Sequence, residues 1–161
     1  MDYRKHHFDL KDSTYGISLF TPPEKNTQKP PLLLLPGEFR TYRSYLEIIK
    51  LFMESGRVVM SPYFPTRKHK NKYGKESSSI AFDLPLIFSI RRAFLLKAVI
   101  TLQEIYCFEK VDVLAHSSGC IPAVFAGLEC GDLFGNFVFD SLPAVTGKES
   151  RWQITMRAMA T

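Results

Sequence analysis

One serine stands in a setting typical of an exposed nucleophile. Residues 115–119 read Ala-His-Ser-Ser-Gly, and they follow an apolar run and precede a segment with helical character. A sharp turn from strand to helix needs small residues two positions before and after the serine, because the chain comes close to itself there. The start of the following helix would also favour negative charge developing near the hydroxyl. These residues predict nucleophilic attack by Ser117.

Two plainer interpretations apply to the same segment. Ser117 could be an ordinary N-terminal helix cap, since serine is a preferred capping residue. The strand before it and the helix after it favour the nucleophile instead. Cys120, three residues further on, is interpreted as a packed thiol rather than a second nucleophile.

Alternating elements must position this serine. The run Leu32-Leu33-Leu34-Leu35 stops at a Pro-Gly pair, which is typical of a strand buried on both faces of a parallel sheet. Amphipathic segments separate it from further short apolar runs. We expect strands at residues 32–35, 57–60, 111–115 and 136–139, and helices at residues 42–55, 86–108 and 120–129. This alternation predicts an α/β fold with a mainly parallel sheet.

An antiparallel hairpin is expected ahead of this region, from residues 3–10 and 15–20. The length of 161 residues is that of one domain. We assign residues 1–140 to a partial core domain. Residues 141–161 show no strong pattern and are interpreted as the start of a cap or a disordered tail.

These segments together resemble the N-terminal part of the α/β-hydrolases. The resemblance covers residues 3–140 and includes LLLLPGE, VVMSPYFP, FEKVDVLAHSSG and GNFVFDS. It implies a serine esterase, lipase or thioesterase that needs no cofactor and acts on a small-molecule or lipid acyl substrate. Serine at position 117 argues against the dehalogenase and epoxide-hydrolase branches, which use aspartate there.

The resemblance also implies an oxyanion hole. Its two donors would be the backbone amides of Ser118 and Glu38, with Phe39 a near alternative to Glu38. In the family the second loop usually reads His-Gly, whereas this chain has Pro36-Gly37. The glycine is kept and the histidine is replaced.

The family's triad runs in the order serine, acid, histidine. Asp140 lies 23 residues after Ser117 and is the candidate acid, although it could simply cap the next turn with Ser141. No histidine occurs among the 44 residues after Ser117. His116 is a poor base, because it precedes the nucleophile and its side chain leaves the turn in another direction.

Three explanations of the missing histidine stay open. The chain could be a C-terminally incomplete copy, an inactive protein, or a hydrolase that recruits His69. The alternative function is a non-catalytic binding or scaffolding protein that keeps the hydrolase fold.

The charge balance adds one candidate contact surface. The chain carries 21 Lys and Arg against 16 Asp and Glu, a net charge of +5. A polar stretch at residues 65–79 is interpreted as a solvated loop, with weak contact to an anionic surface as the alternative. No nucleic-acid partner is expected. The basic residues of this loop are Arg67, Lys68, Lys70, Lys72 and Lys75.

Other function classes find no support. No apolar run approaches the ~20 residues of a transmembrane helix, and the N-terminus does not read as a secretory signal. The three cysteines have no metal-ligand spacing, so we expect free thiols in the cytoplasm. His6 and His7 would point to opposite faces of a strand, and no metal site is expected.

Overall fold

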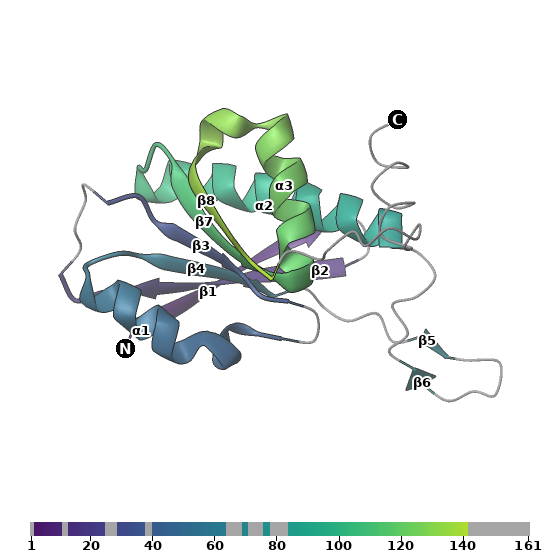
Figure 1. Ribbon diagram of the computed structural model, residues 1–161, viewed down its shortest axis with the longest axis horizontal. Coiled ribbons are helices and arrows are strands. Elements are labelled where there is room, and N and C mark those ends of the chain that lie inside the picture. Colours follow the sequence, from purple (N-terminus) through teal and green to yellow (C-terminus); the bar gives the residue numbers. More distant parts are fainter. Residues whose placement is uncertain are drawn as a thin grey trace.

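A mixed six-stranded sheet forms the centre of the molecule (Figure 1). The computed structural model describes residues 2–10, 13–24, 29–37, 40–63, 69–70, 76–77 and 84–141. The strand order is β1-β2-β4-β3-β7-β8. These strands are β1 (Asp2–Leu10), β2 (Ser13–Thr21), β3 (Leu32–Leu35), β4 (Val59–Tyr63), β7 (Val111–His116) and β8 (Phe134–Asp140).

Strand directions divide the sheet in two. β1 and β2 form the expected antiparallel hairpin, and β2 pairs antiparallel with β4. From β4 the strands β3, β7 and β8 follow in parallel. The predicted α/β fold, with a mainly parallel sheet and an N-terminal hairpin, is confirmed.

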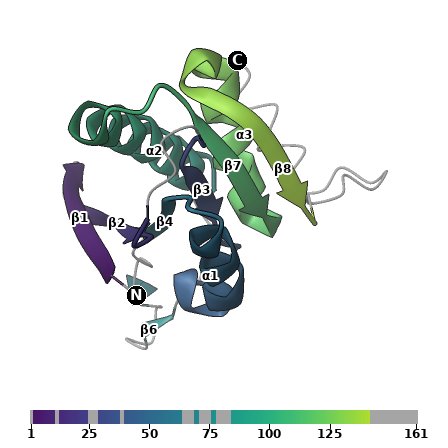
Figure 2. The same ribbon diagram turned by 90° about the vertical axis from the view of Figure 1, so that its left-hand side faces the viewer.

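Helices cover both faces of this sheet (Figure 2). The 3-10 helix η1 (Tyr42–Tyr45) leads into α1 (Leu46–Glu54) on one face. α2 (Leu84–Tyr106) and α3 (Cys120–Glu129) lie on the other. Right-handed crossovers require this division, because the step from β3 to β4 runs opposite to the steps from β4 to β7 and from β7 to β8.

Local signals mark the ends of the first helical segment as the sequence predicted. The hydroxyl of Thr41 caps η1 by accepting a hydrogen bond from the Arg43 amide at 3.3 Å. Gly56 follows α1 with φ 79°, a left-handed conformation that glycine adopts without strain. The sequence chemistry therefore fixes both the entry to and the exit from this helical segment.

β3 explains why four consecutive leucines occur. Leu33 and Leu35 pack into the core under α2 and α3, whereas Leu32 and Leu34 pack with Ile49 of α1. Both faces of the strand are covered, so every side chain is buried. The doubly buried strand predicted from the apolar run is confirmed.

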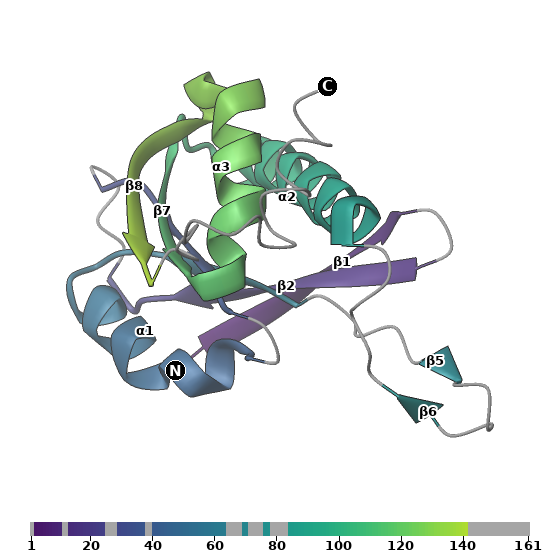
Figure 3. The same ribbon diagram turned by 45° about the vertical axis from the view of Figure 1, so that its right-hand side comes forward.

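Some segments differ from their predictions, and the strand expected at residues 57–60 is β4 at Val59–Tyr63, which runs on through Ser61 and Pro62. Within the stretch expected to be a loop, β5 (His69–Lys70) and β6 (Glu76–Ser77) pair antiparallel. This hairpin stands off from the main sheet (Figure 3). A ladder of two residue pairs is too short to leave a periodic pattern in the sequence. The other basic residues of the stretch and residues 142–161 lie outside the described part.

Among the helices that the structure describes, none combines the length and the apolarity that crossing a bilayer requires.

Candidate active site

Ser117 occupies a sharp turn between β7 and the helix that follows it. His116 still has extended backbone angles, and Ser117 has φ 51°, a left-handed conformation uncommon for a residue other than glycine. The 3-10 helix η2 (Ser117–Gly119) then leads directly into α3. The chain thus passes from strand to helix at one strained residue, which agrees with the setting predicted from the sequence.

Two glycines allow the neighbouring backbone to approach this turn. A Cβ on Gly119 would lie 2.7 Å from the carbonyl oxygens of both Leu35 and Pro36. A Cβ on Gly37 would lie 2.9 Å from His116 Nδ1 and 3.1 Å from the Cβ of Ser117. The loop after β3 is therefore packed directly against the serine turn.

The strand register brings the candidate residues to one edge of the sheet. Leu35 pairs with Ala115, so Gly37 and Ser117 each lie two residues beyond a paired position. His116 pairs with Asp140 at the end of β8. Ser117, the Gly37 loop and Asp140 thus share the C-terminal edge of the parallel strands, where ligands bind in open α/β sheets.

The carboxylate of Asp140 contacts the Ser141 hydroxyl and lies near the His116 ring. Its Oδ1 accepts a hydrogen bond from the Ser141 hydroxyl at 3.1 Å, as expected of a turn cap. Its Oδ2 lies 3.9 Å from Nε2 of His116. The Asp140 side chain is 65% exposed, so water screens this attraction.

Both ring nitrogens of His116 lie near partners other than Ser117. Its Nδ1 lies 3.0 Å from the hydroxyl oxygen of Tyr45, and its other ring nitrogen faces Asp140. Sequence reasoning overlooked Tyr45. Its only signal was its place in the first turn after the Pro36-Gly37 loop, and nothing local shows which way that turn folds.

Of the two backbone amides expected to form the oxyanion hole, the structure describes that of Ser118 and not that of Glu38. Ser118 is buried within η2. Glu38 and Phe39 lie outside the described residues, although Gly37 and Arg40 on either side are placed. The amide of Arg40 donates to the Gly37 carbonyl at 3.1 Å.

Cys120 is held as a packed thiol. Burial, together with the smaller effect of the nearby Asp140 charge, raises the pKa of this thiol to about 11. Its Sγ donates to the Ala115 carbonyl at 3.3 Å. A thiol held protonated at neutral pH is a poor nucleophile.

We therefore expect alkylation to separate the cysteines. With iodoacetamide at pH 8, Cys107, which is exposed, should react at least about 100-fold faster than Cys120. Peptide mass spectrometry of the native protein measures each site, and alkylation in denaturant is the control for peptide recovery. Equal native rates would contradict the packing of Cys120.

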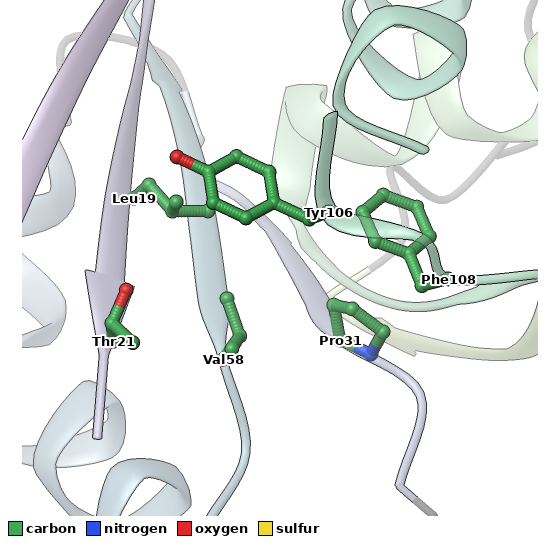
Figure 4. A pocket seen from close by; sticks show the side chains of 6 residues that line it. All are labelled: Leu19, Thr21, Pro31, Val58, Tyr106 and Phe108. Atoms are coloured by element: carbon green, nitrogen blue, oxygen red, sulfur yellow. The ribbon is translucent and has the colours of Figure 1, made fainter. Parts of the chain in front are cut away.

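A small cavity lies at the opposite end of the sheet (Figure 4). Its volume of about 30 Å³ is room for one water molecule. Pro31 precedes β3 and Val58 precedes β4, so the cavity opens at the N-terminal ends of the parallel strands and takes no part in chemistry at Ser117. Its lining residues are Leu19, Thr21, Pro31, Val58, Tyr106 and Phe108.

Within the described ranges, no three histidine, cysteine or acidic side chains gather as metal ligands.

No family model and no curated protein matches this sequence. Several solved structures do match this chain in fold. A thermostable carboxyl esterase from Bacillus coagulans superposes with a TM-score of 0.66 at 17% identity, covering 86% of this chain and 44% of its own. A probable hydrolytic enzyme from Pseudomonas aeruginosa gives 0.61 at 14% identity, covering 95% of this chain and 44% of its own.

Epoxide hydrolase A from Mycobacterium thermoresistibile is also similar, with a TM-score of 0.61 at 16% identity. The match covers 98% of this chain and 45% of the enzyme. These likenesses show that the chain has the α/β-hydrolase fold, shared by esterases and epoxide hydrolases. The chain spans under half the length of the structures it matches.

Proposed function

We propose that this chain carries the nucleophile of a serine hydrolase that acts on an ester or thioester by acyl transfer. The observation that carries the proposal is the left-handed turn at Ser117, against which the Gly37 loop is packed. Glycine adopts this conformation with less strain than serine, so a serine held in it beside a closely packed loop favours a functional role.

The proposed reaction begins with attack of the Ser117 hydroxyl on the acyl carbon. A general base takes the hydroxyl proton, and the tetrahedral oxyanion is held by the backbone amides of Ser118 and Glu38. The intermediate collapses to an acyl-serine, and the leaving alcohol or thiol takes the proton from the base. Water then hydrolyses the acyl-serine by the same steps.

Serine at position 117 is what favours an ester substrate over an epoxide, although the fold is common to enzymes of both kinds. The branch of the family that opens epoxides uses a carboxylate, which the epoxide alkylates to an ester that water then hydrolyses. A hydroxyl instead forms an acyl-serine.

The basic stretch with Arg67 and Lys75 is proposed as a weak contact for an anionic surface. The three free thiols favour the cytoplasm.

The base is the part of the triad that the 161 residues do not supply in the usual order. Asp140 is proposed as the acid, at the strand end next to the serine turn. A histidine contributed by a longer polypeptide, or His69, would complete the set. Without either, the chain would be a non-catalytic binding or scaffolding protein with the hydrolase fold, which is the alternative.

Chemical rescue tests the proposal directly. The purified chain is treated with a fluorophosphonate probe at pH 7.5, with and without about 0.1 M imidazole as a substitute base. We expect imidazole to accelerate labelling at least about tenfold, because general-base assistance contributes ~10²–10⁴-fold in enzymes. Mass spectrometry should place the label on Ser117.

Two variants make the result specific. Ser117→Ala should abolish labelling, whereas Ser44→Ala, at an exposed serine of η1, should leave it unchanged. Imidazole-independent labelling that disappears in His69→Ala would identify His69 as the base. Label on other serines, or none on Ser117 even with imidazole, would favour the binding protein.

A further inference from the structure

Tyr45 joins two backbone segments that are remote in sequence. It is the last residue of η1, and its ring lies edge-on to the imidazole of His116, with centroids 6.0 Å apart. Its hydroxyl oxygen is 3.0 Å from His116 Nδ1 and 3.5 Å from the Gly37 amide nitrogen. One phenol thus contacts both the loop after β3 and the residue before Ser117.

The Gly37 N–H can only donate, so the phenolic oxygen accepts from it. The direction of the second hydrogen bond depends on the His116 tautomer, because the phenolic oxygen has two lone pairs. We assign the phenolic proton to His116 Nδ1. A neutral imidazole that accepts at Nδ1 carries its own proton on Nε2, the nitrogen that faces Asp140.

The Gly37 loop is held on every side. Its amide donates to Tyr45, its carbonyl accepts from the Arg40 amide at 3.1 Å, and its Cα lies against His116 and Ser117. A shift of Gly37 away from the serine turn would therefore break the phenol contact.

We propose that Tyr45 and His116 are positioning residues, which fix the loop after β3 against the serine turn. Tyr45 holds the loop amide, and His116 orients the phenol. Asp140 is the partner of His116 Nε2 in this network. Because its carboxylate is largely exposed to water, we expect it to contribute least to holding the loop. The catalytic consequence rests on the proposed function, whereas the hydrogen-bond network does not.

Tyr45→Phe tests the network by removing one hydroxyl and keeping the ring. The matched control is Tyr42→Phe in the same η1 turn, where the ring packs on Phe20 and Tyr3 instead. Two measurements are independent of any chemistry at Ser117. These are the hydrogen-exchange rate of the Gly37 amide and the ¹⁵N chemical shifts that report the His116 tautomer.

In the unsubstituted chain we expect the Nε2–H tautomer of His116 and a protected Gly37 amide. Tyr45→Phe should mix the tautomers and raise Gly37 exchange about tenfold, whereas Tyr42→Phe should change neither. Labelling of Ser117 with imidazole present should fall about tenfold in Tyr45→Phe, because small misplacements of catalytic groups cost up to ~10²-fold.

A second pair of variants covers the case in which Tyr45→Phe is unstable. His116→Asn offers a side-chain oxygen near the position of Nδ1 and should keep Gly37 protected, whereas His116→Leu should not. Equal protection in both, or an unchanged tautomer and exchange rate in Tyr45→Phe, overturns the inference even if Ser117 labels. Altered exchange and tautomer with no labelling in any variant would support the network and refute the hydrolase proposal.

Discussion

Replacing Gly119 with alanine is expected to lower the free energy of unfolding by about 2–3 kcal/mol, the range typical of overpacking in a close-packed interior. The added Cβ would lie 2.7 Å from two carbonyl oxygens, those of Leu35 and Pro36. Both atoms belong to the backbone at the end of the central strand β3, so neither can rotate away. The serine turn and the loop after β3 would have to separate.

Conformation does not explain this requirement for glycine. Gly119 has φ −66° and ψ −21°, ordinary helical angles that alanine adopts readily. The lack of space for a Cβ is therefore what requires glycine at position 119. Gly131→Ala is the matched control. A Cβ on Gly131 meets nothing within 4 Å, so this substitution should be neutral or slightly stabilising.

Urea-induced unfolding of both variants measures the difference. The midpoint should fall clearly for Gly119→Ala and stay within about 0.5 kcal/mol of the parent for Gly131→Ala. The same substitution should also slow the labelling of Ser117, because the turn moves. Equal stability of the two variants would show that the Gly37 loop does not pack against the serine turn.

The serine turn could be predicted because its requirements are local. Small residues at positions 115 and 119 and the apolar runs on either side lie within one short stretch of sequence. The leucines of β3 were equally informative, since a strand covered on both faces has no polar side chains. Capping at Thr41 and Gly56 belongs to the same local class.

Contacts between remote segments could not be predicted in this way. The phenol of Tyr45 meets His116 across 71 positions of sequence, and only the packing of η1 beside β7 brings them together. The start of β8 is a second case. The sequence indicated a strand from residue 136, whereas the structure begins it at Phe134.

Asp112 accounts for that earlier start. Its Oδ1 accepts hydrogen bonds from the backbone and side-chain nitrogens of Asn136, at 2.8 and 3.0 Å. The first residues of β8 are thereby held beside β7 through an irregular register between Val111 and Val113. A carboxylate on a neighbouring strand, rather than the propensity of residues 134–136, extends the strand.

The same carboxylate also holds the segments that precede β3 and β4. Asp112 Oδ2 pairs with the guanidinium of Arg57, which in turn donates to the Pro30 carbonyl at 2.8 and 2.9 Å. The two charged side chains are only 13% and 16% exposed. One largely buried ion pair therefore connects the segments before β3 and β4 with β7 and β8.

Asp112→Ala should accordingly cost about 3 kcal/mol of unfolding free energy, because it leaves the Arg57 charge buried without its partner. Asp132→Asn, at an exposed acid in the 3-10 helix η3 (Gly131–Leu133), is the control and should change stability by no more than a few tenths of a kcal/mol. Urea unfolding at pH 7 measures both. A loss below about 1 kcal/mol for Asp112→Ala would mean that the pair contributes as little as a surface ion pair.

The contribution of Asp112 should also depend on pH in a defined direction. Burial raises the pKa of this carboxyl, but hydrogen bonds from Asn136 and Arg57 outweigh burial, and the net pKa lies below its ordinary value of 3.8. A carboxyl whose pKa is lower in the folded state stabilises the protein fully above the unfolded pKa and loses that effect as pH falls through the folded value. The stability difference between the parent and Asp112→Asn should therefore be constant from pH 7 to about pH 5 and shrink below about pH 4. A difference that grew on acidification would mean that the folded state raises the pKa of Asp112, and that burial rather than the Arg57 and Asn136 contacts dominates at this position.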